Sequence, residues 1–324
     1  MKSIYCFLFS LFVLFVSCKK NDNDNDNPPP ATREWFKLQT KINTTQYTTG
    51  IPYRDSSSIG IDSANKKIII KEYSSSSGGK DSSTETYTYN NDYQLVLYEH
   101  VDTYDYLFIS RMEFVRDANG QVTKVLSGYK NGLMASSEGF VKYDKRGDTT
   151  LITYLDSAKK HPNGYPDAQD FYQVALVGEK MVYHKDFPIK TAGQSDTSIA
   201  KFEYDASGNL VTETDQYSKT STPIVYTYQR GSEVPKELQK FIAQLTGDLF
   251  WFQRSKFLFY LSEIGYDNYI LGTVVQSIKK DNVAYLSFTN TFDASGNLTT
   301  ISYLGTGGGA FGRPTITEQY KYRP

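Results

Sequence analysis

The sequence is poor in the residues on which thiol, metal and nucleic-acid chemistry depend. Its 324 residues include two Cys, three His and two Trp, and 35 Lys and Arg face 36 Asp and Glu. Two cysteines cannot build a disulfide framework, and a chain without a basic excess lacks the charge that holds nucleic acid. The histidines, His100, His161 and His184, have no metal-ligand spacing. We therefore expect no metal, no cofactor and no nucleic-acid partner.

A single long apolar run stands out, and it lies at the N-terminus, from Ile4 to Val16. It is shorter than the roughly 20 residues that a membrane-spanning helix needs, so residues 1–17 are interpreted as a signal peptide. The run ends in Ser17-Cys18, which resembles the lipobox of bacterial lipoproteins. That resemblance implies acyl chains on Cys18 and attachment to the outer membrane, facing the periplasm or the cell surface. The alternative is an ordinary secretory signal in which Cys18 has no role.

Residues 18–32 are predicted to be a disordered tether that carries the lipidated cysteine. The stretch from Asn21 to Pro30 is polar, repetitive and closed by three prolines, so it cannot bury apolar surface. Alternating aspartates at 22, 24 and 26 match the opening of a calcium loop, but the rest of that loop is missing. Lys19 and Lys20, followed by acidic residues, resemble the export signal that sends some lipoproteins to the cell surface.

Residues 33–324 are predicted to form one all-β domain. Aromatic residues make up 15% of the chain, with 27 Tyr and 19 Phe, and such residues favour strands. The words FEYDASGNLVTE and FDASGNLTTISY begin at residues 202 and 292, and related words are anchored at 62, 90, 117 and 144. The spacing fits multiples of about 28 residues, which is typical of a repeat architecture. Weaker copies lie at 228–231, at 266–268 and near Gly178.

Each repeat is interpreted as a hairpin whose turn carries an aspartate and a glycine. The carboxylate can accept backbone N–H groups of the turn, and glycine tolerates positive φ. These turns are assigned a structural role, with a weak cation site as the alternative; the residues are Asp117, Gly120, Asp144, Gly147, Asp205, Gly208, Asp293 and Gly296. Two strands per repeat predict a large antiparallel meander, curled or closed into a barrel-like sheet.

A transmembrane barrel is the rival architecture. It requires strands of about 10 residues with one face free of charge. Lys124, Glu203 and Glu213 occur within the predicted strands, and the mean hydropathy is −0.49. These charges favour a sheet whose outer face meets water.

The turn words are similar to the YD repeats of secreted β-rich proteins, and the whole plan resembles envelope lipoproteins of unknown function with a porin-like sheet. The resemblance covers most of residues 33–324. It implies an envelope location and no catalytic residues.

One segment, SEVPKELQKFIAQLTG at residues 232–247, departs from the strand pattern. Leu238, Phe241, Ile242 and Leu245 follow helical spacing after Pro235, which predicts one short amphipathic helix. We expect it to cover the apolar face of the sheet. The alternative is a helix that projects outward to dock another envelope protein.

Tyrosine rows are the main indication of function, because exposed aromatic rings stack on sugars; the alternative is that they only fill the core. Glu99, His100 and Asp102 are close in sequence, yet Glu99 and His100 should face opposite sides of a strand. The sequence favours a non-catalytic binding or scaffold module for a glycan or an envelope protein. The alternative is an extracytoplasmic enzyme acting on polysaccharide or peptide.

Overall fold

The computed structural model describes residues 34–47, 53–76, 79–102, 108–129, 137–158, 169–187, 197–218, 220–246, 272–306 and 313–324. The folded part belongs to the unit Trp35–Pro324. The signal peptide, Cys18, the tether, His161 and residues 266–268 lie outside the described residues. No helix in these ranges has the length and apolar character needed to cross a membrane.

The described residues form a single antiparallel sheet of 18 strands and one helix. The strands are β1 (Leu38–Gln46), β2 (Tyr53–Asp62), β3 (Lys67–Ser76), β4 (Gly79–Tyr89), β5 (Leu95–Asp102), β6 (Phe108–Arg116), β7 (Val122–Tyr129), β8 (Ser137–Arg146), β9 (Thr149–Ala158), β10 (Gln169–Val177), β11 (Lys180–Phe187), β12 (Ser198–Tyr204), β13 (Leu210–Gln216), β14 (Ile224–Arg230), β15 (Val275–Lys280), β16 (Val283–Phe292), β17 (Leu298–Leu304) and β18 (Thr315–Tyr322). The helix, α1 (Lys236–Thr246), lies between β14 and β15 in the chain.

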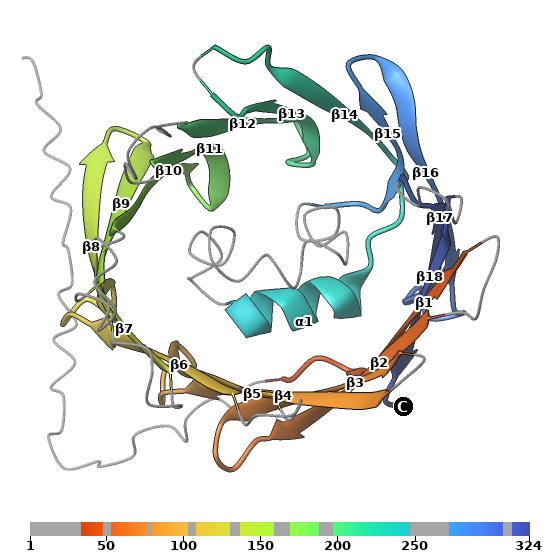
Figure 1. Cartoon of the computed structure of the whole chain (residues 1–324), viewed down its shortest axis with the longest axis horizontal. Helices are drawn as coiled ribbons and strands as arrows, with labels where there is room; N and C mark the ends of the chain where they lie inside the picture. The colour runs from red at the N-terminus through yellow and green to blue at the C-terminus, as the bar shows by residue number, and fades with distance from the viewer. Residues whose placement is uncertain are drawn as a thin grey trace, which may run out of the picture. The chain divides into compact units, whose positions relative to one another are not determined.

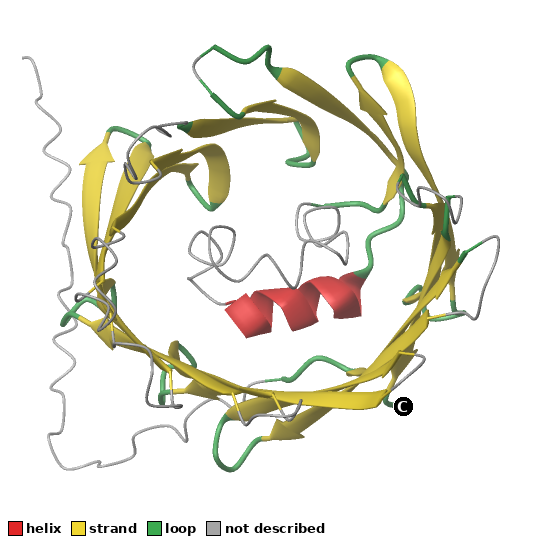
Figure 2. Ribbon diagram, viewed as in Figure 1, coloured by secondary structure: helices red, strands yellow, loops and turns green. Residues whose placement is uncertain are grey.

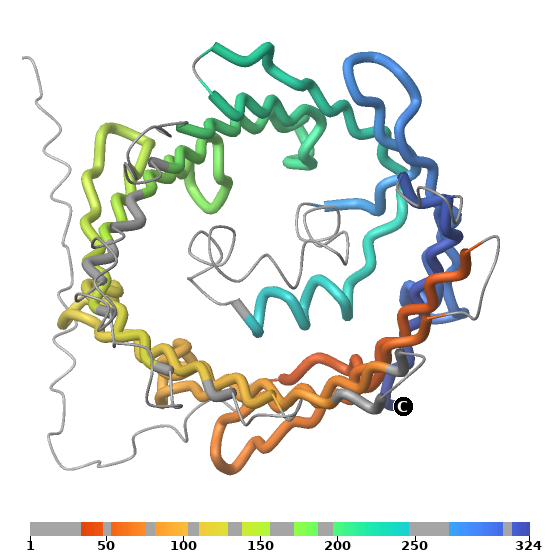
Figure 3. Tube along the Cα trace, in the orientation of Figure 1, coloured from red at the N-terminus to blue at the C-terminus, as the bar shows by residue number. Residues whose placement is uncertain are grey.

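The sheet closes into a barrel (Figure 1). Each strand pairs with the next in sequence, and β18 pairs with β1 from Leu38↔Tyr322 to Gln46↔Thr315. The tube in Figure 3 runs around the ring in chain order and returns to its start. The predicted all-β meander is therefore confirmed, and its last strand closes on its first. Closure removes both bare edges, which would otherwise pair with other chains.

The two ends of the barrel differ. At one end, here called the tight-turn end, short connections join β2 to β3, β4 to β5, and so on to β16 and β17, except that the long segment containing α1 joins β14 to β15. The chain also enters β1 and leaves β18 there, since the Arg323 N–H donates to the Lys37 carbonyl at 2.8 Å. The opposite end, where β1 connects to β2, is called the loop end.

Helix α1 lies inside the ring of strands (Figure 2). It begins just after Pro235, whose carbonyl accepts the Gln239 N–H at 2.9 Å. The exposed fraction is 8% for Phe241, 3% for Ile242 and 1% for Leu245. The ring centroids of Phe241 and Phe36 lie 4.8 Å apart. The predicted helix and its burial are confirmed. The alternative of an outward docking helix is wrong, because its apolar face packs into the barrel core.

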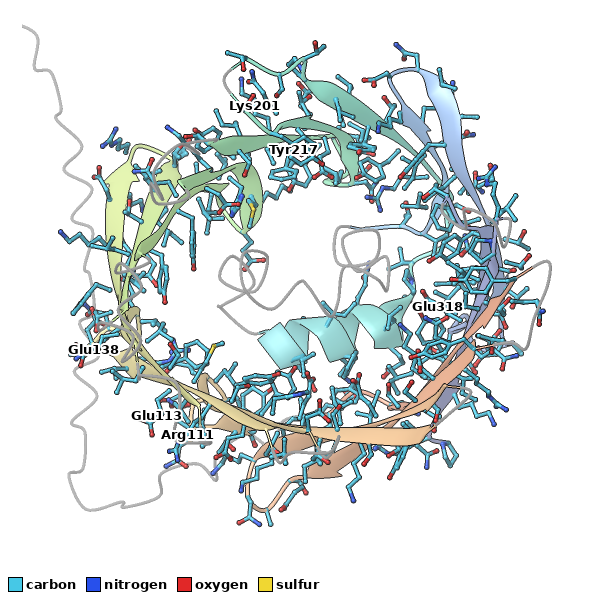
Figure 4. The ribbon with its side chains drawn as sticks, in the orientation of Figure 1. Arg111, Glu113, Glu138, Lys201, Tyr217 and Glu318 are labelled. Atoms are coloured by element: carbon cyan, nitrogen blue, oxygen red, sulfur yellow. The ribbon has the colours of Figure 1, made fainter. Side chains whose placement is uncertain are left out.

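The outer wall of the barrel, meaning the face away from α1, carries charged side chains, and those on β6 and β12 lie in the middle of the strand. Arg111, Glu113, Glu138 and Lys201 point away from the ring (Figure 4). Arg111 pairs with Glu113 at 2.6 Å, and Lys124 pairs with Glu138 at 3.0 Å. A lysine or arginine facing lipid at the bilayer midplane costs about 2–4 kcal/mol. These outer charges fit a wall that meets water better than one that meets lipid.

Candidate functional site on the inner wall

The predicted turn residues lie at the tight-turn end, far from the polar part of the barrel interior described below. Asp205 Oδ1 accepts the Asn209 N–H at 2.8 Å, and Asp293 Oδ1 accepts the N–H groups of Ser295 and Asn297, both at 2.8 Å. Asp117 does the same for Asn119 and Gln121, both at 2.9 Å. The matching glycines, Gly120, Gly208 and Gly296, have φ of 79°, 86° and 79°. These carboxylates thus satisfy backbone donors of their own turns.

Asp144 differs from the other aspartates and requires a correction. It lies within β8, opposite Leu151, and its carboxylate pairs with Arg146 at 2.6 Å. The β8–β9 ladder continues to Arg146↔Thr149, so the turn is only Gly147-Asp148, with Gly147 at φ 61°. The longer hairpin moves the turn three residues past the aspartate. Within the described residues, no three His, Cys, Asp or Glu side chains are placed to hold a metal ion.

The prediction that Glu99 and His100 face opposite sides is confirmed. Glu99 pairs with Arg111 of the outer wall at 4.0 Å, whereas His100 is buried on the inner wall, with its Nδ1 3.7 Å from Glu85 Oε1. His184 is also buried on the inner wall, and its Nε2 is 3.5 Å from Asp186 Oδ1. Glu213, which the sequence counted against a membrane barrel, points inward as well and accepts the Tyr228 hydroxyl at 2.6 Å.

The inner wall, the barrel face toward α1, changes character from one end to the other. On β2, Ile61 and Ile59 near the tight-turn end are followed by Asp55 toward the loop end, and on β3, Ile68 and Ile70 are followed by Glu72. The apolar half packs on α1. Eight carboxylates line the rest of the described inner wall, against two lysines, Lys41 and Lys280: Asp55, Glu72, Glu85, Asp102, Asp186, Glu213, Asp215 and Glu318.

The Lys41 cluster consists of Lys41, Asp55, Glu72 and Glu318. Lys41 Nζ lies 3.5 Å from Glu318 Oε2, and these side chains are 11% and 1% exposed. Burial lowers the pKa of Lys41, and the charges of Glu318, Glu72 and Asp55 act in the opposite direction. The Tyr320 hydroxyl also donates to Glu318. This cluster therefore joins β1 to β18 across the closing pair of strands.

The Glu85 cluster lies beside it on β4 and β5. Glu85 accepts the hydroxyls of Tyr87 at 2.8 Å and Tyr98 at 3.0 Å. Burial, and then the charge of Glu85, raise the pKa of Glu72, and the close approach of the Glu85 carboxylate is the main cause that raises the pKa of His100.

The tyrosine cluster lies across the barrel at the loop end, formed by Tyr217, Tyr226 and Tyr285 with Asp215 and Lys280. Tyr217 is 57% exposed and points to the inside of the ring (Figure 4). Its side chain lies near that of Tyr226, whose ring centroid is 6.0 Å from that of Tyr285. Burial, followed by the charges of Tyr217 and Asp215, raises the pKa of Tyr226 to about 12. Burial also raises the pKa of Tyr217, so the phenols of Tyr217 and Tyr226 are neutral hydroxyls at neutral pH.

Exposed aromatic rings beside carboxylates can hold polyhydroxylated or ammonium-bearing molecules, by stacking, hydrogen bonding and cation–π contact. The sequence indicated tyrosine rows but not this group, since its members come from β13 to β16, and the β14–β15 pairing brings these strands together across the segment that contains α1. The signal that could have found the inner carboxylates is their recurrence two positions after inward-facing apolar residues, as in Ile70 and Glu72.

Comparisons with known proteins find similarity only among solved structures. No family model matches the sequence, and no curated protein matches it. The chain is similar to a porin-like protein from Bacteroides uniformis ATCC 8492, with 13% identity over 88% of this chain and 98% of that one, at a TM-score of 0.42. The barrel architecture itself follows from the strand pairings of this chain.

Proposed function

We propose that this protein is a lipid-anchored envelope protein whose barrel is a non-catalytic module that binds a glycan on its inner wall. The tyrosine cluster is the observation that carries the proposal. Tyr217 leaves more than half of its surface exposed on a wall whose other large aromatics are mostly buried, as Tyr87, Tyr154 and Tyr172 are. An exposed ring beside neutral hydroxyls and a carboxylate suits the apolar face and the hydroxyl edge of a sugar.

The lipid anchor is supported by the signal-like run that ends at Ser17-Cys18. Its test is metabolic labelling of the full chain with a fatty-acid analogue. We expect the wild type to be labelled and to sediment with membranes, and Cys18→Ala to lose the label. Equal labelling of both chains would contradict the anchor and leave the ordinary secretory signal.

Glycan binding is tested with residues 33–324 on an oligosaccharide array. We expect Tyr217→Ala to lose at least tenfold in affinity, because it removes the exposed stacking face. Tyr73 provides the matched control: it is 49% exposed and lies on the outer wall, one residue after the inward-facing Glu72. If Tyr73→Ala weakens binding as much as Tyr217→Ala, the inner wall is not the site.

The surroundings of two inner-wall carboxyl groups favour a second function, hydrolysis of a polysaccharide. Glycosidases need one carboxyl group that stays protonated and one that is ionised. Glu72, with its raised pKa, and the tyrosine-bonded Glu85 are a candidate pair. Release of reducing ends that disappears in both Glu72→Gln and Glu85→Gln would favour the enzyme. Intact oligosaccharides after incubation would favour the binding module.

A further inference from the structure

We infer that the inner wall prefers an amine-bearing glycan, such as one with free amino sugars, and rejects acidic glycans; this inference rests on the proposed function. The proposed function names the tyrosine cluster as the place where the glycan binds, and the charge of the wall around it determines which glycans are accepted.

The first support is the tyrosine cluster, which already contains the ammonium group of Lys280. Lys280 Nζ lies 6.0 Å from the centroid of the Tyr226 ring and 5.8 Å from that of Tyr285. These distances are within the range in which an ammonium is attracted to the face of a tyrosine ring. The adjoining ring of Tyr217 is exposed, so it offers a second face of the same kind.

The second support is the carboxylates beside these rings. Asp215 and Glu213 act electrostatically on both Tyr217 and Tyr226, which places them within interaction range of the same rings. Asp215 lies on the inner wall opposite Ile224, two residues from Tyr226. An ammonium that stacks on Tyr217 would therefore have a carboxylate partner, and a charged hydrogen bond of that kind is about twice as strong as a neutral one.

The third support is the charge of the wall as a whole. Eight carboxylates face two lysines on the described inner wall outside its apolar half. Clustered charge of one sign in a concave, partly desolvated setting attracts the opposite charge and repels like charge. Rings of Asp and Glu select cations in pores on the same principle. A uronic acid polymer would meet repulsion at every step of this wall, and an amine-bearing one would not.

The test compares oligosaccharides of equal length that differ in one group: glucosamine, N-acetylglucosamine and glucuronic acid oligomers. Isothermal titration of residues 33–324 at pH 6 and low salt should give at least tenfold tighter binding of the glucosamine oligomer than of the acetylated one. Binding of the glucuronic acid oligomer should be undetectable. The preference should shrink as salt rises, because screening weakens interactions between charges.

Variants separate this inference from the proposed function. Asp215→Asn keeps the shape of the side chain and should reduce the preference for the amine to about twofold or less. Glu113→Gln removes an outer-wall carboxylate and should leave it unchanged. Equal or tighter binding of the acetylated oligomer would overturn the inference while leaving glycan binding intact. Failure of all three oligomers to bind would overturn the proposed function and this inference together. Denaturant midpoints equal to that of the wild type would show that the variants are folded.

Discussion

At the scale of single residues, Gly208 illustrates what the repeated turn words do. Its φ of 86° lies in the left-handed region, and an added Cβ would come within 2.9 Å of Lys180 Nζ. Gly208→Val should therefore lose about 1–3 kcal/mol of unfolding free energy. Asp205→Ala should lose less, because the turn donors that it leaves can reach water. Urea titration measures both.

Gly128 provides the matched control for this substitution. It lies in β7 without a positive φ, and an added Cβ would meet nothing within 4 Å. Gly128→Val should be neutral or slightly stabilising, because valine favours strands. A similar loss in both variants would show that turn strain is not the cause. Unchanged stability in Gly208→Val together with lost ligand binding would instead favour a binding role for the turn.

Glu72 and His100 make a residue-scale prediction about pH. Both have a raised pKa in the fold, so each binds its proton more tightly there than in the unfolded chain. Their contribution to stability is complete below the reference values of 4.5 for Glu72 and 6.5 for His100, and it is lost as pH rises through the raised values. The unfolding free energy of Glu72→Gln minus that of the wild type should increase as pH rises from 4 to 8, because the glutamine cannot lose a proton. Parallel stability curves for the two proteins would contradict this.

At the scale of elements, α1 depends on the segment that leads into β1. The Lys37 N–H donates to Glu237 at 2.6 Å, the Phe36 N–H donates to Gln244 at 3.2 Å, and Phe36 packs on Phe241. The chain thus holds its interior helix with residues that directly precede its first strand. The barrel wall and the helix should consequently unfold together.

Phe241→Ala tests this packing. Removal of a buried ring leaves a cavity, and such changes cost about 3–5 kcal/mol. Ala243, which is exposed on the same helix, is the control, and Ala243→Ser should stay within about 0.5 kcal/mol. A denaturant titration followed by both tyrosine fluorescence and far-UV circular dichroism should show one transition. A midpoint unchanged in Phe241→Ala would mean that α1 contributes nothing to the barrel core.

At the scale of the whole molecule, closure places a buried ion pair between the first and last strands. Lys41→Met would leave Glu318 buried and unpaired, and loss of one partner of a buried pair costs about 3–5 kcal/mol. Lys41→Met with Glu318→Gln should recover most of that loss, since the amide still accepts the Tyr320 hydroxyl. Lys124→Met, in the outer pair whose side chains are 31% and 37% exposed, should cost less than about 1 kcal/mol. Equal losses in the two single variants would contradict the role of closure.

Much of the fold could be predicted from sequence because its rules are local. The Asp and Gly turn words, the strand alternation around Phe202 and the helical spacing of Phe241, Ile242 and Leu245 each depend on residues a few positions apart. Gly178, predicted from a weak copy, indeed has a positive φ of 60° in a turn. The prediction that Asp144 lies in a turn was wrong for a local reason too, since the turn word does not show how far the β8–β9 ladder extends.

The strands, most of their turns and the one helix follow from the amino-acid sequence, because backbone preference and side-chain period are local properties of the chain. Closure of the meander, and therefore which face becomes an interior, depends on strand pairing between distant parts of the chain. Closure brings Lys41 of β1 to Glu318 of β18, 277 positions later in the chain, and sets Glu99 outside and His100 inside. Alternation along a strand sorts charged side chains onto two faces, and closure of the ring decides which of the two faces is the interior. The acidic, tyrosine-bearing inner wall is thus a property of the barrel, not of any one repeat.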